Sequence, residues 1–164
     1  MRSWVHVVLL ITLGGCATVP PLDLEGVDRA LTPVQATARP GEVRGQRVLW
    51  GGVIVGARNL TDGTELEVLA YPLTGAGKPD RNADPSRRFL LAHSGYLEPV
   101  DYAPGRLVTA VGRVAGTREG KVGETPYTYP VLSADQLHLW PPEAARRTDP
   151  SVHFGVGIGV IFGR

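Results

Sequence analysis

Cysteine is nearly absent from this sequence, since Cys16 is the only one in 164 residues. A single thiol cannot form an intramolecular disulfide, so an oxidising compartment would add no covalent crosslink to the fold. An excess of either charge is also missing, because 17 basic residues face 16 acidic ones. This balance argues against a nucleic-acid partner, which would require a basic surface to neutralise phosphates.

Residues that carry catalysis or bind metals are few and badly spaced. Three histidines fall on three different predicted strands, without a nearby Cys or carboxylate at metal-ligand spacing: His93, His138 and His153. His93, Ser94 and Asp101 include the residue types of a catalytic triad. Adjacent residues on a strand point to opposite faces, however, so a nucleophile and its base would not meet. We expect no catalytic residue, no cofactor and no metal.

Two acidic patterns also have simpler explanations. Glu65 and Glu67 share one face of a predicted strand, as the acid pair of a glycosidase would, but alternating charges are typical of the solvated side of a hairpin. Residues 80–84 resemble the start of a calcium loop. Pro85 replaces the turn glycine and Leu91 replaces the bidentate glutamate, so we interpret the segment as a solvated loop. An envelope hydrolase remains a weaker alternative, which would require a cleft of convergent polar groups.

The first residues have the three parts of an export signal. Arg2 supplies a positive charge, residues 4–13 form an apolar run too short to span a bilayer, and Gly14 and Gly15 are small residues at a cleavage point. Leu13-Gly14-Gly15-Cys16 resembles a bacterial lipobox. We therefore predict that residues 1–15 are a lipoprotein signal peptide, cleaved between Gly15 and Cys16.

Cys16 is the predicted lipidation site. Its thiolate would take a diacylglycerol group, and its new amino terminus would be acylated after cleavage. One acyl chain holds a protein only reversibly, so two or three chains are needed for a lasting membrane anchor. Ala17 stands where an aspartate would retain the protein at the inner membrane, which favours the outer membrane. The alternative is an ordinary cleaved signal followed by an incidental cysteine.

Residues 16–46 are expected to be a lipidated tether with two short helical pieces. The first is indicated by apolar residues at i, i+3 and i+7: Leu24, Val27 and Leu31. In the second, Thr32 is a capping residue, Pro33 occupies the first helical position and Gln35 follows three residues after the cap. Pro40-Gly41 would end this second piece.

From Arg47 the apolar pattern has a period of two, which is typical of strands. Five strands are expected, at residues 47–55, 64–71, 89–93, 106–115 and 127–140. Asn59 to Gly63 predicts a hairpin turn, and glycines at 116, 120 and 123 indicate another. Short curled strands with glycines at the bends favour an all-β fold, a small OB-like barrel of about five to six strands spanning residues 47–140.

Several short sequence blocks occur in order along this region: LWGGVI (49–54), TELEVL (64–69), YPL (71–73), RFL (88–90), GYLEP (95–99), GRLVT (105–109), YTYPV (127–131) and LW (139–140). Together they resemble the Slp family of starvation-inducible outer-membrane lipoproteins. The resemblance implies a lipid-anchored outer-membrane protein that faces the periplasm. It also implies an envelope role in stationary phase, starvation or acid stress, without an established enzymatic activity.

The C-terminal tail, residues 151–164, follows a Pro-rich linker at 141–150. Its apolar residues occupy every second position and glycines lie between them: Val152, Phe154, Val156, Ile158, Val160 and Phe162. This pattern indicates a strand with one apolar and one bare face. The strand either packs on the barrel or joins copies of the chain into a homo-oligomer or pore component, since one strand alone cannot close a barrel in lipid.

Overall fold

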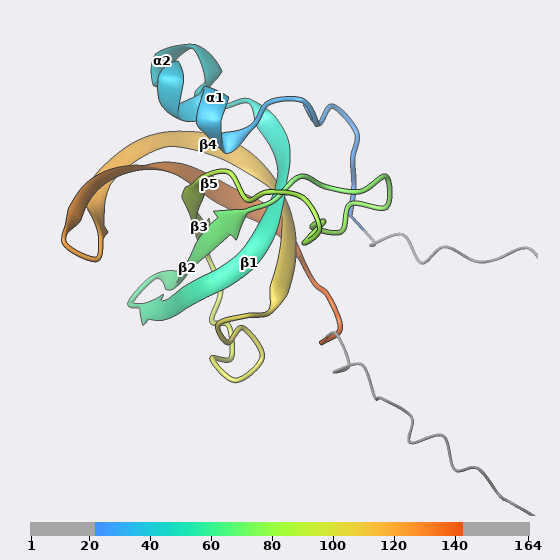
Figure 1. Cartoon of the computed structure of the whole chain (residues 1–164), viewed down its shortest axis with the longest axis vertical. Coiled ribbons are helices and arrows are strands. Elements are labelled where there is room, and N and C mark those ends of the chain that lie inside the picture. Colours follow the sequence, from blue (N-terminus) through green and yellow to red (C-terminus); the bar gives the residue numbers. More distant parts are fainter. Residues whose placement is uncertain (1–21, 143–164) are drawn as a thin grey trace, which may run out of the picture.

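Five strands form a closed barrel in the computed structural model, which describes residues 22–142 (Figure 1). The strands are β1 (Arg47–Leu60), β2 (Gly63–Ala70), β3 (Arg88–His93), β4 (Leu107–Val122) and β5 (Thr125–Leu139). They close in the order β1-β2-β3-β5-β4, and all neighbours are antiparallel except β3 and β5. The predicted all-β, OB-like barrel is therefore confirmed.

The inward face of each strand follows the period of two that the sequence shows. Leu66, Val68 and Ala70 of β2 point into the core, as predicted, and are buried. Trp50 of β1 packs edge-on against Phe89 of β3, with ring centroids 5.3 Å apart. These large apolar side chains fill the interior, so the barrel is a packed core.

Strands β4 and β5 extend further than the sequence predicted. They remain paired from Val108↔Leu139 out to Val122↔Thr125, and Gly116 and Gly120 lie inside β4 instead of in the hairpin turn. Gly116 has a φ of 124° and lies at a register shift, where the strand bends. The bend lets the outer half of this long hairpin curl back over β2 and β3.

The segment before β1 packs against the barrel. Helix α1 (Pro33–Ala38) begins with the predicted capping box, in which Thr32 and Gln35 bond to each other's backbone amides. A second short helix, α2 (Pro40–Val43), follows directly. Pro40 thus begins a helix, whereas it was expected to end one.

The predicted helical piece at Leu24, Val27 and Leu31 is wrong. Asp28 accepts hydrogen bonds from the amides of Ala30 and Leu31 through its side chain, and its own amide donates to the carbonyl of Arg47. These side-chain bonds compete with helical ones and favour a turn.

The predicted signal peptide, Cys16 and the C-terminal tail lie outside the described residues 22–142. Within that range, neither helix has the length or the hydrophobicity that crossing a bilayer would require.

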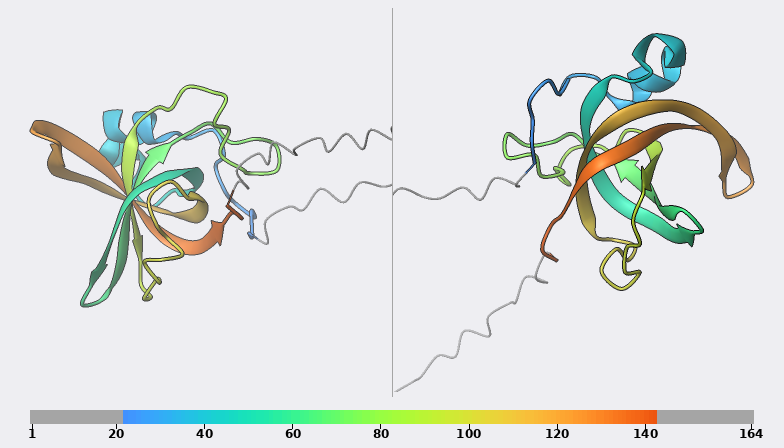
Figure 2. Two further views of the ribbon diagram at one scale, coloured as in Figure 1. Left: turned by 60° about the horizontal axis from the view of Figure 1, so that its bottom comes forward. Right: turned by 180° about the vertical axis from the view of Figure 1, so that it is seen from behind.

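The two long hairpins and the two ends of the described chain lie on opposite sides of the barrel. In all three views, the β1–β2 and β4–β5 turns are on one side, and the blue and orange ends of the ribbon leave from the other (Figures 1 and 2). The barrel therefore has a hairpin side and a side from which the chain ends depart.

Candidate functional site

A polar groove of about 440 Å³ lies on the hairpin side of the barrel. Its walls are residues 56–58 of β1 and residues 118–121 of β4, and its floor contains Glu65, Glu67 and Leu90 from β2 and β3. The volume is within the range of small-molecule and cofactor sites. The outer face of strands 2 and 3, between these two hairpins, is also where OB-folds bind ligands.

Glu65 holds the two walls of this groove together. Its carboxylate accepts hydrogen bonds from Arg58 of β1 at 2.8 and 2.5 Å, and from Arg118 of β4 at 2.5 Å. The Glu65 side chain is only 4% exposed, whereas Arg58 and Arg118 are 63% and 44% exposed. Two guanidinium groups thus compensate one buried carboxylate, as burial of a charge requires.

Glu67 forms a second polar cluster further along the same face of β2. Its carboxylate accepts bonds from Arg88 at 2.7 Å and from the Tyr129 hydroxyl at 3.1 Å. The Tyr129 hydroxyl also lies 2.8 Å from the carbonyl of Lys121. Burial, and then the Glu67 carboxylate, raise the pKa of Tyr129 above its ordinary value, so its hydroxyl stays protonated and can donate.

The prediction that Glu65 and Glu67 form a solvated hairpin side is wrong for Glu65. The β4–β5 hairpin curls over β2 and covers this carboxylate, and the alternating pattern of β2 contains no signal of that cover. Both carboxylates are engaged by arginines, so the arrangement favours binding through charge and hydrogen bonds. It does not resemble an acid and base arranged around a scissile bond.

The other residues considered from the sequence lie away from this groove. His93 ends β3, and His138 of β5 stacks edge-on against Trp140 with ring centroids 4.4 Å apart. Burial lowers the pKa of His138. Asp80 accepts bonds from Asn82 in a local turn. Across residues 22–142, no three His, Cys, Asp or Glu side chains are grouped where they would hold a metal ion.

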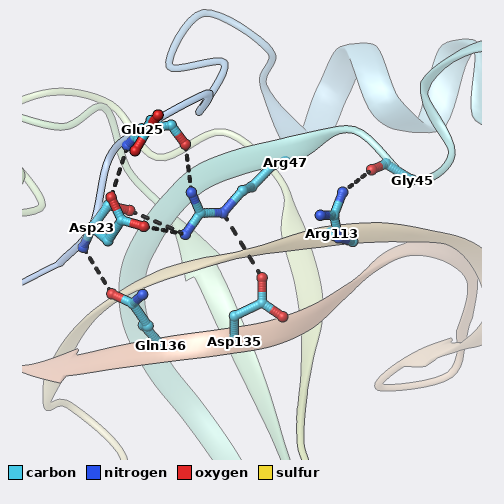
Figure 3. A network of polar contacts seen from close by, with 7 residues as sticks. All are labelled: Asp23, Glu25, Gly45, Arg47, Arg113, Asp135 and Gln136. Carbon is cyan, nitrogen blue, oxygen red and sulfur yellow. Dashed lines mark hydrogen bonds and ion pairs between the residues drawn. The ribbon is translucent and has the colours of Figure 1, made fainter.

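A polar clamp fixes the N-terminal segment to the barrel (Figure 3). The Arg47 guanidinium donates to the carbonyl of Glu25 at 2.5 Å and to the Asp23 carboxylate at 3.2 Å, and it lies 3.9 Å from Asp135. The Asp23 amide donates to the side chain of Gln136 on β5. The Glu25 amide, and then Arg47, lower the pKa of Asp23. The chain is thus held against β1 and β5 from Asp23 onward.

The comparisons with known proteins identify a family over most of the chain. The model of the Outer membrane lipoprotein Slp family matches residues 13–158. The uncharacterized lipoprotein YeaY of Escherichia coli (strain K12) is 36% identical over 135 residues, which are 79% of this chain and 67% of that protein. Outer membrane protein Slp of the same organism is 29% identical over 135 residues, covering 80% of this chain and 71% of that protein.

Among solved structures, a small single-stranded DNA-binding protein from Streptomyces coelicolor is similar to this chain. Its sequence is 15% identical, and the match covers 58% of this chain and 94% of that one, with a TM-score of 0.35.

Proposed function

Because the chain belongs to the Slp family of outer membrane lipoproteins, we propose that it is anchored in the outer membrane through lipid on Cys16, with its barrel on the periplasmic side. The proposed lipid is a diacylglycerol on the thiol and an acyl group on the new amino terminus. The signal peptide, residues 1–15, would be removed between Gly15 and Cys16.

The observation that carries this proposal is the position of the N-terminal segment. The clamp at Arg47 and Asp23 holds the chain on the side of the barrel opposite the hairpins. Cys16 precedes Leu22 by six residues, and an extended chain of that length spans about 20 Å. A lipid at Cys16 would therefore hold the barrel close to the membrane, with the groove directed away from it.

We propose a non-enzymatic binding or structural role for the barrel in the cell envelope, in stationary phase, starvation or acid stress. The polar groove supports binding over catalysis, because arginines engage both of its floor carboxylates. The lack of exposed stacking aromatics in the described groove argues against a nucleic-acid partner. Single-stranded nucleic acids bind to positively charged grooves with exposed stacking aromatics, and Tyr129 is buried here.

The test is Cys16→Ser, with Thr18→Ser as a matched control next to it. The variant is expected to leave the outer-membrane fraction, and the control is expected to stay there. Intact mass spectrometry of the mature control should show a chain beginning at Cys16 with added lipid. Sedimentation of Cys16→Ser with the outer membrane, or an unmodified Cys16 in native material, would refute the anchor.

A second candidate function is an oligomeric, membrane-associated assembly formed through residues 151–164. The alternation of apolar residues and glycines in this tail favours it, because such a strand can stack closely against copies of itself. The tail lies outside the described residues, and the competing proposal is that it packs on the barrel of its own chain.

A further inference from the structure

Within residues 22–142, the groove is lined by two strand edges that have no partner strand on the groove side. The β1–β4 ladder covers only Arg47–Val53 of β1 and Leu107–Arg113 of β4. Beyond it, among the strands that the structure describes, residues 56–58 pair only with β2, and residues 118–121 pair only with β5. Both stretches form walls of the groove. An unpaired edge presents a row of N–H and C=O groups that can pair with another chain.

The register shows which backbone groups face the groove. The β4–β5 hairpin has a two-residue loop that closes on the pair Val122↔Thr125. Moving away from the loop, hydrogen-bonded pairs alternate with pairs that are not hydrogen-bonded. The residues of the latter pairs direct their N–H and C=O groups away from the partner strand of the hairpin. Glu119, which lies opposite Thr128, is at such a position. Its amide and carbonyl therefore point to the groove.

The opposite edge of the same hairpin is blocked. Pro126 and Pro130 of β5 occupy its outward positions and have no N–H to donate, and the carbonyl of Thr128 accepts a bond from Arg87. Strand β4 contains no proline. Prolines are a common protection of exposed strand edges. One edge of this hairpin is thus closed to pairing, while the edge toward the groove is open.

The acidic and the basic side chains of the groove lie at different depths. Glu65 and Glu67 lie on the floor and are 4% and 28% exposed, whereas the cationic side chains lie at the rim. Arg58 and Arg118 are both more than two-fifths exposed and share the single carboxylate of Glu65. Lys121 is exposed as well. Glu119 is acidic, but the three other charged residues at the rim are basic. The rim therefore favours an acidic ligand.

We propose that the groove binds an extended, acidic peptide segment of another protein, which adds to the edge of β4 as a further strand. Backbone bonds to Glu119 would supply the pairing, and carboxylates of the peptide would meet Arg58, Arg118 and Lys121. This inference deepens the binding role proposed above and names its ligand class. It does not depend on whether Cys16 carries lipid.

The test uses the full mature chain in detergent and a synthetic peptide of alternating threonine and glutamate, with binding followed by calorimetry. Glu119→Pro removes the outward amide without removing a β4–β5 ladder bond, and we expect roughly tenfold weaker binding. The matched control is Thr128→Pro, on the edge that is already blocked. It removes the hydroxyl that bonds the Glu119 carboxylate but no amide that faces the groove, so its affinity should equal that of the unchanged protein. Glu119→Gln keeps the amide and should bind at least as tightly as the unchanged protein.

Two peptide variants test the unchanged protein, so the result does not depend on folding of the proline variant. Methylation of alternate backbone amides of the acidic peptide should abolish binding, because it prevents strand pairing. Replacing its glutamates by lysines should also abolish binding. Equal binding of the methylated peptide, or of Glu119→Pro, would overturn strand addition. A failure of the unmodified acidic peptide to bind at all would overturn the ligand class. Fractionation of Cys16→Ser, which tests the anchor, is unaffected by either result.

Discussion

At the scale of single residues, Glu65 connects three strands through one buried carboxylate. Removing one partner of a fully buried ion pair usually lowers the free energy of unfolding by about 3–5 kcal/mol, whereas an exposed ion pair contributes about 0–1 kcal/mol. Glu65 is buried, but Arg58 and Arg118 are largely exposed and would regain water if the carboxylate were lost. The contribution of this cluster should therefore lie between the two limits.

We predict that Glu65→Gln lowers the free energy of unfolding by about 1–2 kcal/mol, measured by urea denaturation. The substitution keeps the side-chain volume and removes the charge that two guanidinium groups share. Glu124→Gln, in the exposed loop of the β4–β5 hairpin, is the control and should change stability by less than about 0.5 kcal/mol. Equal stability of the two variants would show that the cluster contributes nothing.

His138 makes stability depend on pH. Burial lowers its pKa below the ordinary value of 6.5, because the charged imidazole loses hydration beside Trp140. A lowered pKa in the folded state gives stability that is present above 6.5 and is lost as the pH falls through the folded value. We predict that urea midpoints decrease from pH 8 to pH 5, and that His138→Gln weakens this decrease. An unchanged slope in the variant would contradict the prediction.

At the scale of elements, β1 can lie as close to β2 as it does only because Gly52 lacks a side chain. A Cβ at this position would lie 1.9 Å from the carbonyl oxygen of Leu69 on β2, which is far inside van der Waals contact. The obstacle is backbone, so no side-chain rotation relieves it. Gly52 is paired with Ala70 on one side and Val108 on the other, which prevents β1 from shifting aside.

Gly52→Ala is therefore predicted to destabilise the barrel by at least about 3 kcal/mol, above the usual cost of overpacking a core. Gly56→Ala, four residues further along β1, is the matched control because its Cβ would meet nothing within 4 Å. The control should be within about 0.5 kcal/mol of the unchanged protein or slightly more stable. Thermal unfolding monitored by circular dichroism compares the two, and similar melting temperatures would refute the argument.

Local patterns in the sequence predict most of the elements. The period of two marks all five strands, and the spacing from Thr32 to Gln35 marks α1, because these signals depend only on neighbouring residues. The apolar spacing at residues 24–31 does not produce a helix, because Asp28 bonds to nearby amides and to β1. Local patterns do not predict the groove either. Its walls come from hairpins far apart in sequence, and nothing local in β2 shows that β4 covers Glu65.

At the scale of the whole molecule, the N-terminal clamp and the groove lie on different sides of the barrel. The clamp at Arg47 fixes the segment that leads to Cys16 on one side, and the groove opens on the other. A protein tethered by the first side presents the second to its surroundings. Lipid anchoring at Cys16, which remains a prediction, and peptide pairing at β4 would therefore not compete for the same surface.

The position of the chain end relative to the groove also leads to a prediction about the C-terminal tail, residues 151–164. The described chain ends on the side opposite the groove, and we expect the tail to pack on its own barrel near that end, which would leave the groove open and the protein monomeric. We expect amine and carboxylate crosslinking in native membranes to give the same monomer band for the full chain and for a chain lacking residues 151–164. A ladder of oligomers that disappears with the truncation would instead support assembly through the tail. In that case the apolar residues from Val152 to Phe162 would be the contact, and Phe154→Asp alone should remove the ladder, because burying an unpaired carboxylate in an apolar interface is too costly.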